Sequence, residues 1–350
     1  MRSALMAGHV RRIERIAAAA DDVAALPDEL LTALDEAIGF DAVCSGVLDP
    51  GTMIPTALRL TGHPQGMVSS AEALSVVLGA DEHSRTRTLA NLSRPVEILS
   101  HAYAGDIERS ALYRHVLSPQ GFEHSLRVML VIDDACWGFV SFLRHASRPD
   151  FTAEDAELAL AIAPGLARSQ RDLMLEQDHS SLPVGPPGVI VVDERLAIQS
   201  ASSEARRWLA ELGEGAGLPA VAQAVAAAAL LQSHPRARAR VRTPTGSWLH
   251  IHATLLKGQP QPSVAVVLES ARPDHLVPVV ARAHGLTPRE REIAALVVEG
   301  HSTIEIASEL FLSPHTVKDH LKAVFDKVQV RSRRDLAAAL SCPGTPRRTA

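Results

Sequence analysis

Apolar residues recur at helical spacing in some stretches of the chain and form strand-like runs in others, and their order predicts three folded regions. In the first, residues 26–175, apolar positions repeat with a helical period from Asp28 to Ile38. Another helix is expected after Thr152, which has Asp155 three positions later and Pro164 inside the helix. Strand-like runs lie between the two helices at Phe40–Leu48, Met53–Leu60, Ser125–Ile132 and Cys136–Leu143. Helices at both ends of antiparallel strands predict an α+β domain.

The second region, residues 189–269, has the same mixed character. Two short strands flank an Asp-containing turn at its start and precede a helix that begins near Ser202. An Ala-rich helix is expected next, followed by a hairpin and a last strand, at Ala220–Leu231, Ala239–Thr243, Trp248–Leu255 and Val264–Leu268. The pattern predicts a second α+β domain.

The third region, residues 286–340, contains only helical patterns and predicts an all-α domain of four short helices. Each helix begins with Ser or Thr, and three have an acid three positions later: Glu290 after Thr287, Glu305 after Ser302 and Asp335 after Ser332. This spacing is typical of a capping box, in which hydroxyl and acid each accept a backbone N–H. The helix that begins at Ser313 and Pro314 has the cap but no acid. An N-terminal end that approaches phosphates would explain the omission.

Shorter segments flank and join these regions. We expect an N-terminal helix within residues 1–25 and a linker rich in proline and glycine at residues 176–188. Residues 270–285 are predicted to be a connector, in which 274–284 can form a short helix kinked at Pro278. The tail at residues 341–350 is predicted to be disordered.

Spacing and charge in the last helices indicate how they are used. Val317, Leu321 and Val324 lie on one face of the helix 314–327, and two helices joined by a short turn have helix-turn-helix geometry. Residues 286–311 hold two arginines against five glutamates, a net charge of −3, whereas residues 312–340 hold six basic residues against three aspartates, a net charge of +3. Positive charge gathered on the second helix pair is expected of a surface that contacts phosphates.

Composition limits the class of protein. The 350 residues carry a formal net charge of −5 and are 46% hydrophobic, which describes an ordinary globular protein without a global basic field. Three cysteines far apart in the chain fit neither a disulfide framework nor a zinc site. We find no signal peptide and no apolar run long enough to cross a bilayer, so we expect a cytoplasmic protein without a membrane partner.

The block Leu286–Ile293, together with Glu305–Ala307, Leu312-Ser313 and Thr316–Leu321, closely resembles the LuxR-type helix-turn-helix. The resemblance implies a transcriptional regulator that acts as a homodimer and places the helix 314–327 in the major groove of double-stranded DNA, with RNA polymerase as a further candidate partner. The DNA-binding residues expected from motif position and charge are Ser313, Thr316, Lys318, Asp319, Lys322, Lys327, Arg331 and Arg333. Gln329 replaces the glycine usual in the family, so a less regular helix end is expected.

The first two regions resemble sensor domains. Residues 26–175 resemble a GAF domain at Pro119–Phe122, Trp137-Gly138 and Arg148–Thr152, which implies a cavity over an antiparallel sheet and a small-molecule ligand of unknown identity. Residues 189–269 resemble a PAS domain, with Ser202 where that family commonly has asparagine. We therefore expect these domains to control the spacing of two C-terminal domains on DNA half-sites.

Other patterns support competing hypotheses. The C-terminal helices could be an interaction module, which leaves the missing acid unexplained, or a sigma-factor region, which the 3% aromatic content disfavours. His250 and His252 lie on one strand face and could bind a metal, but no third ligand is near in sequence. Cys44 or Cys136 could serve a thiol redox enzyme with the C-terminal helices as its assembly module. We predict a protein that is not an enzyme, with no catalytic residue, cofactor or metal.

Overall fold

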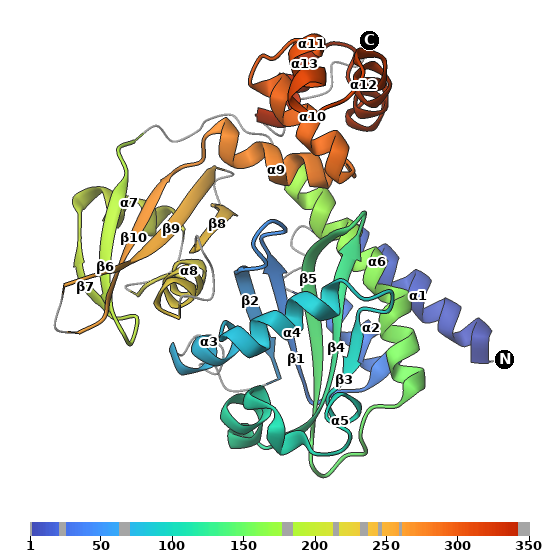
Figure 1. Ribbon diagram of the computed structural model, residues 1–350. Coiled ribbons are helices and arrows are strands. Elements are labelled where there is room, and N and C mark those ends of the chain that lie inside the picture. The colour runs from blue at the N-terminus through green and yellow to red at the C-terminus, as the bar shows by residue number, and fades with distance from the viewer. Residues whose placement is uncertain are drawn as a thin grey trace.

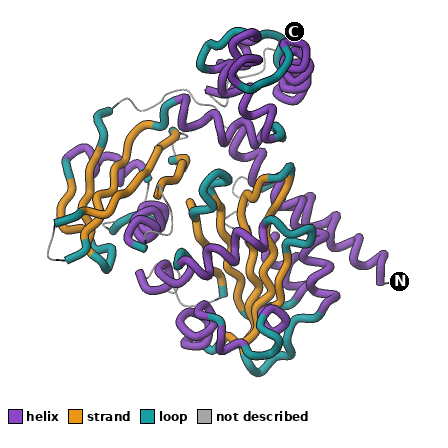
Figure 2. Tube along the Cα trace, in the orientation of Figure 1, coloured by secondary structure: helices purple, strands orange, loops and turns teal. Residues whose placement is uncertain are grey.

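The computed structural model describes residues 2–20, 26–62, 71–176, 185–212, 217–231, 237–243, 247–258 and 261–341. Figures 1 and 2 show two domains that each contain a sheet with helices, followed by a helical C-terminal domain. The predicted fold class, two α+β domains and an all-α domain, is confirmed. Most of the predicted linker at 176–188 and the tail at 341–350 lie outside the described residues, so both stay predictions.

The first domain is a five-stranded antiparallel sheet with the strand order β2-β1-β5-β4-β3. One face packs on α1, α2 and α6 through a core that includes Ile13, Leu34 and Phe142, and α3 and α4 lie over the other face (Figure 1). The sequence patterns missed β3 and the short helices between β2 and β4. The elements are α1 (Arg2–Ala19), α2 (Asp28–Ile38), β1 (Ala42–Leu48), β2 (Pro55–Thr61), α3 (Ala71–Val77), α4 (Ala80–Ala90), β3 (Val96–Ile98), α5 (Leu99–Ala102), η2 (Ile107–Arg109), η3 (Tyr113–Leu117), η4 (Ser118–Gln120), β4 (Phe122–Ile132), β5 (Ala135–His145) and α6 (Ala153–Glu176).

The second domain has the same antiparallel strand order, β7-β6-β10-β9-β8. Its sheet packs on the Ala-rich α8, whose buried residues include Ala224, Val225 and Ala226. Ile54 and Leu74 of the first domain belong to the same core, so the two domains pack directly on each other. The elements are β6 (Gly188–Asp193), β7 (Ile198–Ala201), α7 (Ser203–Glu211), α8 (Ala220–Leu230), β8 (Ala237–Arg242), β9 (Trp248–Leu256) and β10 (Ser263–Ser270).

The C-terminal domain is built from α9 (Pro273–Ala283), α10 (Pro288–Val298), α11 (Thr303–Glu309), α12 (Pro314–Val328) and α13 (Arg333–Ser341). Within the segment predicted as a connector, α9 contains Pro278 and buries Leu276, Val280 and Ala281 in the core formed by α10–α13. Trp248 of β9 enters this core as well. The helical domain is therefore packed on the second sheet through α9.

A buried ion pair joins the three parts of the molecule. Arg240 on β8 donates from Nε to Asp49 Oδ2 at 2.7 Å and from Nη2 to Asp49 Oδ1 at 2.5 Å. Its Nη1 donates to the carbonyl oxygen of His275 on α9 at 3.1 Å. Asp49 follows β1, so one guanidinium group contacts the first domain, the second domain and the helix that leads to the C-terminal domain.

Candidate nucleic-acid interface

Capping boxes begin α10 and α11 of the C-terminal domain as predicted. Thr287 N–H donates to Glu290 Oε2 at 2.8 Å, and Thr287 Oγ1 accepts Glu290 N–H at 3.3 Å. The same two bonds between Ser302 and Glu305 measure 2.6 and 3.3 Å. At α13, Ser332 Oγ accepts Asp335 N–H at 3.1 Å, which is the hydroxyl half of the third predicted box.

The start of α12 differs from these helices. Ser313 Oγ accepts Thr316 N–H at 3.0 Å and lies 2.8 Å from the Thr316 hydroxyl, with Pro314 as the first helical residue. The first turn contains no acid. Because backbone N–H groups and the helix dipole leave partial positive charge at a helix N-terminus, this end remains available to an anion.

The two faces of α12 separate apolar from polar residues. Val317, Leu321, Val324 and Val328 are buried in the domain core. Lys318, Asp319 and Lys322 are exposed on the other side. His315 approaches Asp319 at 3.9 Å, and both side chains are largely exposed, so this pair constrains the surface only weakly. The exposed face thus offers two cations, one in the second turn of the helix and one near its middle.

Lys327 and Arg333, also predicted to bind DNA, have partners within the domain. Lys327 Nζ donates to Glu290 Oε2 at 2.7 Å and to Gly285 O at 3.2 Å. Burial alone would raise the pKa of Glu290, but the bonds from Lys327 and Thr287 outweigh it and lower that pKa. Arg333 donates to Thr303 Oγ1 at 3.2 Å and to His301 O. Arg331 is exposed.

The end of α12 is regular despite the missing glycine. Gln329 adopts the left-handed conformation, with φ of +59°, and the N–H groups of Gln329 and Val330 both donate to Phe325 O. The expectation of a less regular helix end is wrong, because the glutamine takes up the conformation that glycine adopts more freely. A non-glycine residue in this conformation costs about 1–2 kcal/mol.

The turn between α11 and α12 exposes an apolar residue that the sequence patterns did not single out. Phe311 is 95% exposed at a φ of +54°, and Ile304 on α11 is 73% exposed. Large apolar side chains that are this exposed indicate an interaction site when they lie close together on the protein surface. The signal in the sequence was the phenylalanine directly before the turn residues Leu312 and Ser313.

The first domain contains a cavity between its sheet and α3 and α4. Its walls are mainly apolar, with Leu58, Val77 and Phe139 among them, and its polar lining includes Ser125, Arg127 and Ser141. Arg127 is held by Glu82 at 2.9 Å and by Ser141 at 3.2 Å. This is the place at which the resemblance implied a small-molecule site.

The two thiols considered for redox chemistry lie in or beside this cavity. Cys44 lines it, and burial raises the pKa of the Cys44 thiol to about 11. Burial also raises the pKa of Cys136 to about 12. Since the thiolate is the reactive form, the raised pKa of each thiol argues against a role as a redox nucleophile.

The histidine pair considered for metal binding lies on β9, and the fold adds partners that sequence spacing could not show. His250 Nδ1 is 3.2 Å from Glu269 Oε1 on β10, and the His275 ring on α9 lies 3.8 Å from the His250 ring, measured between centroids. His252 Nδ1 is 3.9 Å from the same carboxylate oxygen. These residues come from three separate elements.

No helix among the described residues has both the length and the apolar character needed to cross a membrane.

Residues 284–340 match the family model described as bacterial regulatory proteins, luxR family. The spore germination protein GerE of Bacillus subtilis is 44% identical over 55 residues, which are 16% of this chain and 74% of GerE.

Longer relatives match over a similarly short stretch of the chain. Mb0914c of Mycobacterium bovis, named as an HTH-type transcriptional regulator, is 45% identical over 67 residues, which are 19% of this chain and 8% of that protein. The chain thus spans under a tenth of the length of these mycobacterial relatives. Among solved structures, Escherichia coli SdiA aligns with 89% of this chain and 87% of its own at 15% identity and a TM-score of 0.27, too low to support an argument about the α+β domains.

Proposed function

We propose that this chain, which belongs to the LuxR family of bacterial regulatory proteins, regulates transcription by inserting α12 into the major groove of double-stranded DNA. The observation that carries the proposal is the start of α12. Among the helices of this domain that the structure describes, α12 is the one that combines a capped N-terminus without an acid with two exposed lysines. That combination suits a helix directed at phosphates and base edges.

The eight predicted residues divide into two roles. We assign contact with DNA to Ser313, Thr316, Lys318, Asp319, Lys322 and Arg331. Lys327 and Arg333 instead position the helices, because each already has partners within the domain. Lys327 ties the end of α12 to the capping box of α10, which holds the exposed face of α12 in place.

The operator is unknown, so the experiment first recovers DNA fragments that the full chain retains from genomic DNA. Affinity is then measured against salt concentration. Lys318→Ala and Lys322→Ala should each weaken binding and reduce the slope of log K against log salt by about one for each phosphate that the variant no longer neutralises. Lys257→Ala, which removes an exposed lysine at the end of the second sheet, is the matched control. Unchanged affinity and slope in both α12 variants would contradict the proposal.

We further propose that a small molecule with an apolar body binds in the cavity of the first domain and controls DNA binding. Ligand sites in proteins commonly have mostly apolar walls and a few convergent polar groups, as this cavity has. A thermal-shift screen of the full chain against Leu58→Trp, which fills part of the cavity, tests this idea. Compounds should raise the melting temperature of the wild type only, and equal shifts in both proteins would contradict it.

A homodimer acting in the cytoplasm completes the proposal. Two C-terminal domains must match half-sites spaced by about one helical turn, so a small change in their separation would alter affinity. Light scattering of the complex with a recovered DNA fragment should give two chains per duplex. A single chain on each high-affinity duplex would exclude the dimer.

Thiol titration distinguishes the proposed DNA-binding regulator from the redox-enzyme alternative. With the pKa of Cys44 near 11, alkylation at neutral pH should be slower than that of free cysteine by on the order of 10². The rate should rise as the pH approaches that pKa, because the thiolate fraction increases. Rapid alkylation at neutral pH, located at Cys44 by peptide mass spectrometry, would revive the alternative.

A further inference from the structure

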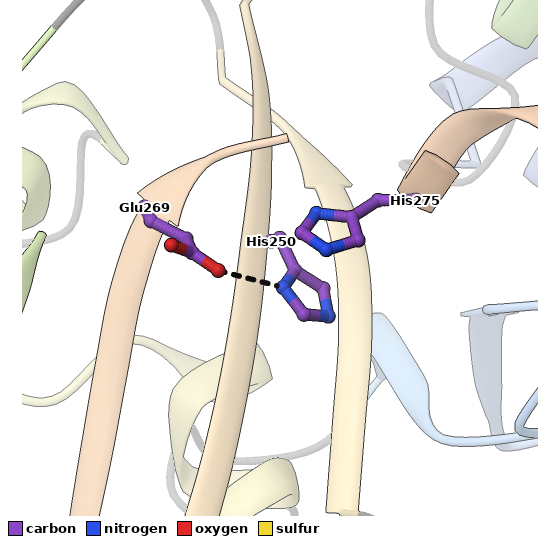
Figure 3. A group of neighbouring side chains, drawn as sticks. All are labelled: His250, Glu269 and His275. Carbon is purple, nitrogen blue, oxygen red and sulfur yellow. Dashed lines mark hydrogen bonds and ion pairs between the residues drawn. The ribbon is translucent and has the colours of Figure 1, made fainter. Parts of the chain in front are cut away.

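Two imidazoles and a carboxylate meet where the second sheet joins α9. His250 and Glu269 are directly paired across β9 and β10, and His275 comes from the first turn of α9. Figure 3 shows the two rings and the carboxylate converging, and their ligand atoms all lie within 4.8 Å of one another. The position is independent of both the α12 surface and the cavity of the first domain.

We propose that His250, Glu269 and His275 bind a divalent transition-metal ion of the Zn²⁺ type. Two nitrogen ligands and one oxygen ligand suit Zn²⁺, whereas Ca²⁺ and Mg²⁺ prefer oxygen ligands alone. Ligands about 2.1 Å from a tetrahedral ion lie roughly 3.4 Å apart. The distance of 3.2 Å between His250 Nδ1 and Glu269 Oε1 already fits one edge of such a tetrahedron.

Nearby positive charges are compensated. Arg240 bonds to the His275 carbonyl oxygen, but it is paired with Asp49. Arg272 lies 3.4 Å from His275 Nε2 and 3.7 Å from Asp274, so its charge is partly offset. His252 Nδ1, at 3.9 Å from Glu269, can approach as a further ligand.

The site would have a structural effect beyond its own residues. A bound ion would tie β9 and β10 to the first turn of α9, and α9 packs on α10 and α13. The side chain of Glu269 is 23% exposed, against 9% for His250 and 12% for His275, which leaves an approach for the ion from the carboxylate side.

The test uses untagged full-length protein stripped with a chelator and titrated with Co²⁺ as a spectroscopic probe and with Zn²⁺ by calorimetry. The wild type should bind one ion per chain, and excess Mg²⁺ should not compete. Glu269→Gln and His275→Gln should weaken binding by more than the roughly 10- to 100-fold that loss of an outer-shell partner costs.

His301→Gln is the matched control, because that imidazole also faces carboxylates, Glu309 at 3.3 Å and Glu299 at 3.8 Å, but in the C-terminal domain. It should bind Co²⁺ as the wild type does. Circular dichroism and metal-free melting temperature establish that the two ligand variants are folded. Wild-type affinity in both ligand variants, no ion retained by the wild type, or loss of binding in His301→Gln alone would overturn the proposal.

Discussion

The two α+β domains share one strand order and differ in what lies over the sheet. In the first domain, α3 and α4 leave a cavity over the sheet. In the second, the small side chains of α8 lie directly on the strands, and the buried residues Ala224 and Ala226 are fully covered. The same topology therefore provides space for a ligand in one domain and a packed layer in the other. Both domains contact α9, the first through α6 and the second through Trp248 of β9.

The largest effect is expected where the two domains meet. Arg240→Met would leave the carboxylate of Asp49, which is 2% exposed, without its cation. Breaking a buried pair in this way should destabilise the protein by about 3–5 kcal/mol. Urea unfolding followed by tryptophan fluorescence measures the change, since Trp137 lies in the core of the first domain, Trp208 in that of the second and Trp248 in the core of the C-terminal helices.

Two further variants separate the cost of an unpaired buried charge from the cost of removing an ion pair. The double substitution Asp49→Leu with Arg240→Met should recover most of the stability, because no unpaired charge remains. Glu157→Gln removes the partner of Arg94 in an exposed pair and should cost no more than about 1 kcal/mol. If the double variant is as unstable as Arg240→Met alone, the penalty does not come from the unpaired carboxylate.

A smaller effect should distinguish the cavity from the packed layer. Ala226→Leu adds volume to the close-packed core around α8 and should destabilise by about 1–3 kcal/mol through overpacking. Ala73→Leu adds the same atoms to the cavity wall on α3, where space is available, and should change stability by less than about 1 kcal/mol. Chemical unfolding of both variants under one set of conditions makes the comparison. Equal losses would mean that the cavity closes in solution.

Features set by neighbouring residues could be predicted from the sequence. The capping bonds of Thr287 and Ser302 and the buried face of α12 depend on spacings of three or four residues, which a sequence displays directly. The exposed lysines Lys318 and Lys322 follow from the same helical period.

Features that depend on how distant elements pack together could not be predicted from the sequence. Asp49 and Arg240 are 191 positions apart, and Lys327 and Glu290 are 37 apart, so their pairing depends on how whole elements pack. Charge alone made Lys327 a DNA contact in the sequence analysis, whereas the fold gives it a partner. His275 lies in a segment predicted only as a connector, and nothing in its local pattern relates it to His250.

The smallest effect concerns how the helices over each sheet begin. Ser202 Oγ accepts the N–H groups of Ala205 at 3.1 Å and Val189 at 3.2 Å. Ser202→Ala should cost about 1 kcal/mol, as should Thr152→Ala at the start of α6. Ser202→Asn restores the residue usual in PAS domains and should stay within a few tenths of a kcal/mol of the wild type, since Asn and Ser cap equally well. Because Val189 is 42% exposed, water can replace the bond to its N–H, and the two alanine variants should lose similar stability. A much larger loss for Ser202→Ala in urea unfolding would mean that this serine holds β6 in the sheet as well as capping α7.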